Sequence, residues 1–244
     1  MGIGHDFMQM TRYENLEPSD QTRGVSQPPL ELAAPHEEAI PLPDPAGLDR
    51  GAMTLREVIA RRRSIREYAE TPLTTTDLAF LLWATQGVTR VVSRVATLRT
   101  VPSAGARHAL ETFVLVNRVT GFTPGLYRYL ALSHAMTPRD TDPAVARSAV
   151  QGCLGQQFVA SCAAAFIWAA VPYRMTWRYG ERGYRYLHLD AGHAAQNLYL
   201  AAESLGCGAC AIAAFDDDAM SRLIGADGSE LFVIYVATVG YPRR

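Results

Sequence analysis

The chain has 244 residues, of which 48% are hydrophobic, and its formal net charge is −1. This length supports one substantial hydrophobic core, or one domain with appendages. The near-zero charge excludes a global field that would draw the chain to nucleic acid or to an anionic membrane.

No stretch approaches the roughly 18 apolar residues that cross a bilayer, and the N-terminus lacks the apolar core of a secretory signal, so we expect a cytoplasmic protein. All 23 basic residues are arginine. No lysine can therefore act as a Schiff base or general base, and a phosphate would be held by arginine, hydroxyl or backbone N–H groups.

Residues 1–50 contain seven of the 14 prolines and show little periodicity. They predict an N-terminal arm in extended conformation, either disordered or lying across a neighbouring surface. Residues 51–244 are expected to form the folded domain. Its first helix starts at Thr54, which fits a capping box with Glu57, and continues into the arginines at 61–63. An apolar stripe is expected on this helix at Leu55, Val58 and Ile59.

A second helix is expected from Thr74 to Gly87, with Leu78, Leu81 and Leu82 on its buried face. Residues 88–100 are expected to be a loop. Beyond them the apolar pattern predicts strands at 112–117, 123–129, 163–171 and 231–239, a strand or loop at 209–215, and helices at 143–160, 186–205 and 216–224. This mixture lacks strict βαβ alternation and favours an α+β fold.

The first candidate site is the run from Arg61 to Arg66, where the predicted helix gives way to extended chain. Its guanidinium groups and the hydroxyl of Ser64 occur at a density that suits a dianionic phosphate. The alternative is a solvated helix end, because the helix dipole stabilises cations at a C-terminus. The residues alone leave both interpretations open.

Two further segments combine small side chains with accessible backbone. Residues 101–106 would let the backbone approach a flat ligand, with Ser103 as a hydrogen-bond donor; the alternative is an ordinary surface turn. Residues 208–215 would present backbone N–H groups to a cofactor ring; the alternative is tight core packing. At the start of the second segment, Cys207 and Cys210 have the spacing of a redox pair. Because they follow a long helical pattern, we interpret them as small buried residues.

The long predicted helix carries His193 and Asn197, which share one face at a spacing of i, i+4. No second histidine or acid on that face completes a metal set, so we interpret His193 as a core or interface histidine and expect no metal site. The motifs GxxxxGK, GxSxG and HExxH are absent, and no GxGxxG follows a strand. The chain therefore lacks its own dinucleotide-binding motif and the common hydrolase signatures.

The order of these segments resembles the flavin-dependent nitroreductase superfamily and, within it, the SagB-type dehydrogenases. The run Arg62-Arg63-Ser64-Ile65-Arg66-Glu67-Tyr68 is similar to the opening RRSxRxY/F signature of that family. Further matches lie at residues 73–87, 99–105, 124–129 and 184–198, so the resemblance spans about residues 54–242. It implies a nitroreductase-like α+β fold with a central, mainly antiparallel sheet flanked by helices, in an intertwined homodimer with FMN at the interface.

The resemblance also implies which residues contact FMN. The phosphate and ribityl chain would be held by Arg62, Ser64 and Arg66, with Arg63 nearby. The flavin of the partner subunit would be reached by Pro102, Ser103, Ala104 and Gly105. The remaining implied contacts are Gln157 with the ring edge or ribityl chain, the backbone of Ala213 and Ala214 near flavin N5, and Arg243 or Arg244 with the phosphate.

Azoline-oxidising SagB members carry a Lys-Tyr pair thought to assist proton removal, and this chain has no lysine. The corresponding candidates are Arg178-Tyr179, with Tyr184 nearby, and secondly Arg185-Tyr186. Arginine is a poor general base because its pKa lies above about 12, whereas a tyrosine can relay a proton. Thiazole or oxazole formation is therefore in doubt, although dehydrogenation in general is not.

We predict an FMN-dependent oxidoreductase that dehydrogenates a peptide- or amino-acid-derived substrate in natural-product biosynthesis, by hydride transfer to flavin N5. One alternative is an NAD(P)H-dependent reductase of nitro, quinone or enone compounds. Another is a non-catalytic flavin-binding subunit of a biosynthetic complex. The expected partners are a second copy of the chain, a small-molecule or peptide substrate and biosynthetic enzymes, without nucleic acid or membrane.

Overall fold

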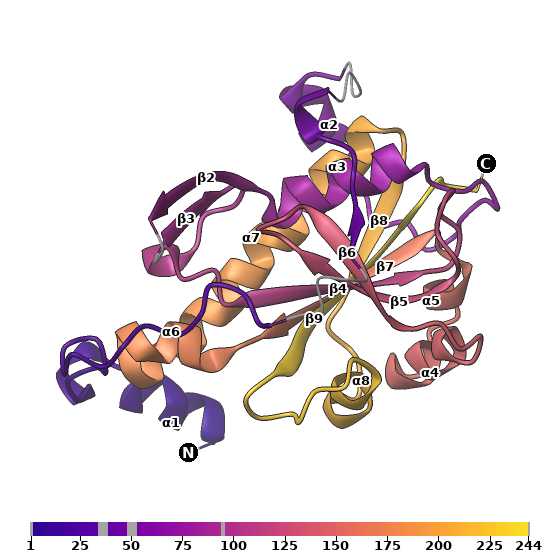
Figure 1. The fold of residues 1–244 in the computed structure, drawn as a ribbon. Helices are drawn as coiled ribbons and strands as arrows, with labels where there is room; N and C mark the ends of the chain where they lie inside the picture. The colour runs from indigo at the N-terminus through magenta and orange to yellow at the C-terminus, as the bar shows by residue number, and fades with distance from the viewer. Residues whose placement is uncertain (1, 34–38, 48–52, 94–95, 244) are drawn as a thin grey trace.

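The computed structural model describes residues 2–33, 39–47, 53–93 and 96–243. Within these residues the chain forms a seven-stranded sheet with helices packed on it, and a separate two-stranded hairpin (Figure 1). Neighbouring strands of the large sheet all run antiparallel, in the order β1-β6-β5-β4-β7-β9-β8. The predicted α+β fold, with a central antiparallel sheet flanked by helices, is confirmed.

The strands of the large sheet are β1 (Ile40–Pro41), β4 (Leu110–Val116), β5 (Gly125–Leu130), β6 (Ala135–Asp140), β7 (Ala164–Ala170), β8 (Gly208–Ile212) and β9 (Phe232–Gly240). The hairpin consists of β2 (Val88–Ser93) and β3 (Ala96–Arg99). The α-helices are α1 (Ile3–Met10), α2 (Leu55–Arg61), α3 (Thr75–Gln86), α4 (Val145–Gly152), α5 (Phe158–Ser161), α6 (Pro172–Tyr179), α7 (Gly183–Ser204) and α8 (Asp217–Leu223). Short 3-10 turns lie at Tyr13–Asn15, Pro45–Gly47, Ala104–Ala106 and Gly180–Arg182.

Strand β7 lies inside the sheet, between β4 and β9, and is buried along its whole length. Its side chains alternate between two cores: Phe166 and Trp168 pack with α3 and α7, whereas Ile167 packs on the opposite face with α4, α5 and α8. This alternation is the period-two pattern of a strand with both faces covered. None of the helices formed by the described residues is both long and apolar enough to span a membrane.

The predicted start of α2 is confirmed. The side chain of Thr54 accepts the N–H of Glu57 at 3.3 Å, and the Glu57 carboxylate accepts the N–H of Thr54 at 2.8 Å. Two details of the prediction are wrong. The helix ends at Arg61 instead of continuing through the arginine run, and of its expected apolar stripe only Val58 is buried, while Leu55 and Ile59 remain exposed.

The second helix, α3, follows its prediction closely. A capping box of Thr74 and Asp77 opens the helix, and Gly87 is its C-cap residue. The expected apolar face is fully buried and consists of Leu78, Leu81 and Leu82. This helix therefore forms one wall of the core that also packs against α7.

Three other predictions need correction. The expected loop at 88–100 instead forms the β2–β3 hairpin. Val91 and Val92 of this hairpin are exposed, so the segment lacks the buried apolar residues by which strands were predicted. The expected helix at 143–160 is broken between α4 and α5, because Leu154 and Gly155 adopt positive φ angles of 54° and 79°. Strand β6 was not predicted, since Pro138 and a half-exposed outer end obscure its pattern.

The N-terminal segment, defined here as residues 2–33, was expected to be extended but contains helix α1. Its last residues lie against β4 and β5. The Leu32 N–H donates to Glu111 at 2.9 Å, and Arg128 donates to the carbonyls of Leu32 and Ala33 at 2.7 and 3.0 Å. The segment thus lies across the folded domain.

Candidate functional site

The arginine run leaves α2 and continues as extended chain beside β8. Ser64 forms a parallel bridge with Ala209, and the Ile65 N–H donates to the Ala209 carbonyl at 2.9 Å. The Ser64 hydroxyl lies 2.9 Å from the hydroxyl of Tyr199 on α7, and the Arg62 guanidinium lies 5.1 Å from the centre of the Tyr199 ring. The extended backbone and the aromatic ring therefore fix the positions of Arg62 and Ser64.

The other arginines of this run point toward solvent. Arg63 and Arg66 are exposed, and the Arg66 guanidinium lies 6.0 Å from the centre of the Phe158 ring. The backbone N–H of Arg243 donates to the Glu67 carbonyl at 3.0 Å, so the C-terminal strand runs beside the same segment. Arg244 lies outside the described residues. The structure thus places Arg62, Arg63 and Arg66 on one extended segment with the backbone of Arg243 beside it, while Arg61 pairs with Glu203 on α7 at 3.3 Å.

Ala213 and Ala214 follow β8 directly and are exposed. The side-chain amide of Gln156 donates to the Ala214 carbonyl at 2.8 Å. Gln157, which the sequence singled out, donates instead to the carbonyl of Gly155 within its own loop at 3.2 Å. Sequence reasoning missed Gln156, although the adjacent Gln-Gln pair offered both positions.

The loop at residues 102–105 is bonded to α7 through Asp190, whose Oδ1 accepts the Ala104 N–H at 3.2 Å. Farther along α7, Asn197 donates to the carbonyl of Ala84 on α3 at 2.8 Å and to that of Thr100, just before the loop, at 3.4 Å. Burial raises the pKa of Asp190, whose other carboxylate oxygen is buried without a partner. Within the loop the Ser103 side-chain oxygen accepts the His108 N–H at 2.8 Å, and Pro102 remains exposed.

Arg178 and Tyr179 end α6 directly against this loop. Gly105 has a φ of 57°, and a Cβ atom there would lie 2.5 Å from the Tyr179 hydroxyl and 2.9 Å from the Arg178 side chain. Glycine is therefore required both by the backbone angle and by the close approach. The Arg178 guanidinium lies 5.6 Å from the centre of the Tyr179 ring, and Tyr184 packs half-buried against the core.

A cluster next to Tyr179, which the sequence did not predict, consists of Tyr186, Tyr13 and Arg182. The Tyr179 and Tyr186 rings meet edge to face, with centroids 4.8 Å apart. The Tyr186 hydroxyl lies 3.0 Å from the hydroxyl of Tyr13, and Arg182 donates to it at 2.8 Å. Tyr13 lies in the N-terminal segment, which carries no local signal that would link it to α7.

The arginine run and the 102–105 loop contact different parts of α7. Tyr199 lies beside the arginine run and Asp190 lies beside the loop, nine residues apart. At 1.5 Å per residue, this separation is about 14 Å along the helix axis. Within one chain the two segments are therefore anchored at different levels of α7.

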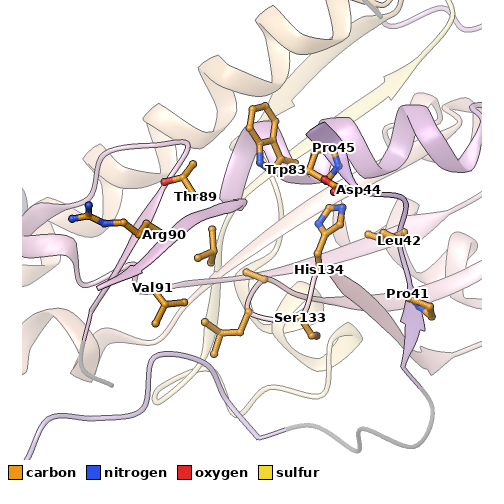
Figure 2. A pocket seen from close by; sticks show the side chains of 13 residues that line it. Pro41, Leu42, Asp44, Pro45, Trp83, Thr89, Arg90, Val91, Ser133 and His134 are labelled. Atoms are coloured by element: carbon orange, nitrogen blue, oxygen red, sulfur yellow. The ribbon is translucent and has the colours of Figure 1, made fainter. Parts of the chain in front are cut away.

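The remaining candidates lie elsewhere. His193 is exposed on α7 and is therefore not a core histidine; the interface and catalytic interpretations both stay open. All four cysteines are buried and none of them forms a disulfide, and burial raises the pKa of Cys162 to about 12. Figure 2 shows a cavity of about 750 Å³ between β2 and the turn before β6, lined by Trp83, Arg90 and His134. This cavity contains none of the predicted site residues.

Comparison with known proteins identifies the family. The model of the nitroreductase family matches residues 59–241. A nitroreductase-family protein of Methanocaldococcus jannaschii (MJ1384) is 40% identical over 170 residues, which cover 70% of this chain and 83% of that protein. The trifolitoxin-processing protein TfxB of Rhizobium leguminosarum is 32% identical over 112 residues, which cover 44% of this chain and 30% of TfxB.

Among solved structures, the Escherichia coli microcin synthetase McbBCD complex, with truncated pro-MccB17 bound, contains a chain of the same fold. The TM-score is 0.65 at 20% identity, and the match covers 99% of this chain and 92% of that chain. At this identity the likeness concerns the fold alone. With the family model and the M. jannaschii relative in agreement, this chain belongs to the nitroreductase family, whose members are flavin-dependent oxidoreductases.

Proposed function

We propose that the chain is a SagB-type dehydrogenase, which binds FMN in a homodimer and oxidises a peptide- or amino-acid-derived substrate in natural-product biosynthesis. Membership of a flavin-dependent family supports the redox chemistry. The similarity to the trifolitoxin-processing protein and the shared fold with a microcin synthetase chain support the substrate class. The observation that carries the proposal is the position of Tyr179, whose hydroxyl lies against the loop expected to face the flavin.

The residues present fit FMN. A phosphate dianion requires cationic or hydroxyl donors near the surface, and Arg62, Arg63 and Arg66 supply them on a backbone fixed by β8. A flat ring system requires backbone that it can approach closely, and the exposed Ala213 and Ala214 leave it accessible. These residues, with Ser64, Gln157 and Arg243, would hold one FMN.

A homodimer would complete the site. In each chain the 102–105 loop meets α7 about 14 Å along the helix from the arginine run, and in the proposed dimer this loop would contact the partner's cofactor. Apolar side chains that a monomer leaves exposed are available for such an interface. They include Leu55 and Ile59 on α2 and Leu189 on α7.

Tyr179 is the proposed proton-handling group. Dehydrogenation removes a hydride and a proton, and bound FMN would accept the hydride with its two electrons. The other hydrogen leaves as a proton, and a tyrosine hydroxyl at the loop can receive or relay it. The Arg178 guanidinium makes a cation–π contact with the Tyr179 ring. Because its pKa is so high, it cannot accept the substrate proton itself. Tyr184, half-buried nearby, is the second candidate.

Flavin content and electron donor test the proposal together. The purified protein should be yellow, should release FMN on denaturation and should gain thermal stability when FMN is added. Under anaerobic conditions the flavin should be reduced by peptides carrying an azoline or a similar oxidisable group, and oxygen or another acceptor should reoxidise it. A colourless protein that neither binds FMN nor shifts its melting temperature would refute the proposal.

The family name favours one alternative, an NAD(P)H-dependent reductase of nitro, quinone or enone compounds. Rapid anaerobic bleaching of the flavin by NAD(P)H would support it over the dehydrogenase. The microcin synthetase neighbour, which is part of a complex, favours another alternative, a flavin-binding subunit that is inactive without biosynthetic partner enzymes. Turnover by the isolated homodimer would exclude that subunit role.

A further inference from the structure

The N-terminal segment precedes the family match, which begins at residue 59. It nevertheless binds the helix that carries Arg178 and Tyr179. Four hydrogen bonds attach it to α6: Gln21 N–H to the Trp177 carbonyl (2.8 Å), Trp177 Nε1–H to the Val25 carbonyl (2.9 Å), Arg174 Nε–H to the Pro29 carbonyl (2.8 Å) and the Tyr173 hydroxyl to Asp20 (2.9 Å).

The same segment also binds the start of α7, on the other side of Tyr179. Arg182 donates to the Thr11 carbonyl at 2.9 Å, and Arg185 donates to the Thr11 side chain at 2.7 Å and to the Met8 carbonyl. The corner between α6 and α7 turns at Gly180, where φ is 55°. The chain before and after this corner is therefore held by a segment that lies outside the family match.

Tyr13 makes the contact nearest to Tyr179. Its hydroxyl lies 3.0 Å from that of Tyr186, and its ring lies under the Arg182 guanidinium, 4.2 Å from the ring centre. Arg182 also donates to the Tyr186 oxygen, and either hydroxyl of the Tyr13–Tyr186 pair can donate to the other. The three side chains thus form one hydrogen-bonded group. Tyr186 in turn packs edge to face on Tyr179.

We propose that Tyr13 is a positioning residue of the catalytic site: it holds Tyr186, and through the Tyr186 ring it fixes Tyr179 against the 102–105 loop. The inference rests on the proposed function, because it takes Tyr179 as the group that meets the substrate. It assigns a role in the site to a residue outside the family match. Chains of this family with a different N-terminal segment would then position this tyrosine differently.

The charged surroundings give the Tyr13–Tyr186 pair a measurable signature. The hydrogen bond from Tyr186, with a smaller contribution from the charge of Arg182, lowers the pKa of Tyr13, whereas burial raises the pKa of Tyr186. Further charges on these elements are Arg178 over Tyr179, Arg185 bonded to Thr11, and the exposed pair Arg12–Glu14 beside Tyr13. Tyr13 should therefore ionise before most of the 11 tyrosines of the chain.

The test compares the FMN-loaded wild-type protein with Tyr13→Phe, which keeps the ring under Arg182 and removes only the hydroxyl. The matched control is Tyr173→Phe, which removes another hydroxyl bonded between α6 and the N-terminal segment. Absorbance at alkaline pH should show one early phenolate step in the wild type and in the control, and none in Tyr13→Phe. Amide hydrogen exchange across residues 177–187 should rise at least several-fold in Tyr13→Phe and little in the control.

In the FMN-loaded protein, the flavin absorption band should shift with the same midpoint as the early phenolate step, because Tyr179 links the pair to the cofactor. Tyr13→Phe should abolish this shift while FMN affinity stays within about twofold. The inference would be overturned by any of three results. These are an early phenolate step still present in Tyr13→Phe, amide exchange unchanged in that variant, or a flavin absorption band that does not shift with the phenolate step. A wild-type protein that binds no FMN would refute the proposed function, and the phenolate and exchange measurements would still decide the positioning role.

Discussion

The substitution Glu111→Gln should destabilise the fold strongly and release the end of the N-terminal segment. Glu111 lies on β4 and is only 3% exposed. Its carboxylate accepts from Arg128 at 2.8 and 3.1 Å, from Arg174 at 2.6 Å and from the Leu32 N–H at 2.9 Å. Both arginines are themselves buried, so one carboxylate compensates two guanidinium groups.

The magnitude follows from those uncompensated charges. Glutamine keeps the shape of the side chain but leaves Arg128 and Arg174 buried without a counter-charge at this position. Removing one partner of a buried ion pair typically costs about 3–5 kcal/mol. For a chain of this size, about 2–4 °C of melting temperature correspond to each kcal/mol, so we expect a decrease of roughly 6–20 °C.

The assay is thermal and urea unfolding with FMN at the same saturating concentration for each variant, since a bound cofactor raises the apparent stability. Amide exchange should also increase at residues 29–33, because Leu32 loses its charged acceptor. Glu70→Gln, at an exposed position, is the matched control and should change stability by less than about 0.5 kcal/mol. A loss below about 1 kcal/mol for Glu111→Gln would refute this account of the network.

Arg66→Ala should raise the FMN dissociation constant about 10- to 100-fold through the loss of one charge-assisted contact. The control is Arg56→Ala, also at an exposed position; equal FMN affinity in the two variants would show that the arginine run does not bind FMN. Gly105→Ala should lower the melting temperature more than Gly155→Ala, since both have positive φ but only Gly105 abuts Tyr179; equal decreases in thermal unfolding would contradict the contact. Burial lowers the pKa of His108 to about 3, so the unfolded chain binds one more proton below pH 6.5. Stability should then fall by up to about 1.4 kcal/mol per pH unit from about pH 6 toward 3, and urea unfolding of His108→Asn should lack that slope.

Local signals in the sequence predicted the helices and strands that bury continuous apolar side chains. The Thr54–Glu57 and Thr74–Asp77 capping boxes located two helix starts, and the apolar run at 163–171 located the central strand. The β2–β3 hairpin was missed because its valines are exposed, and β6 because its outer half is polar and contains Pro138. Their strand conformation depends on tertiary pairing instead of on a buried periodic face.

The candidate site, too, was predictable only where its residues are contiguous in the sequence. The arginine run and the 102–105 loop were recognisable because each is a short contiguous motif with a distinctive composition. The contact of Gly105 with Tyr179 and the pairing of Tyr13 with Tyr186 join residues that are 74 and 173 positions apart. Such contacts depend on where whole helices pack. No local pattern in the sequence contains them.

We propose that this chain holds FMN between two copies of itself. The most direct measurement is the flavin content of the purified protein, by visible absorption and by identification of the released cofactor, together with its mass in solution. The account predicts one FMN per chain in a dimer, with the flavin lost when Arg62 and Arg66 are both replaced by alanine. A colourless monomer to which added FMN does not bind would contradict it.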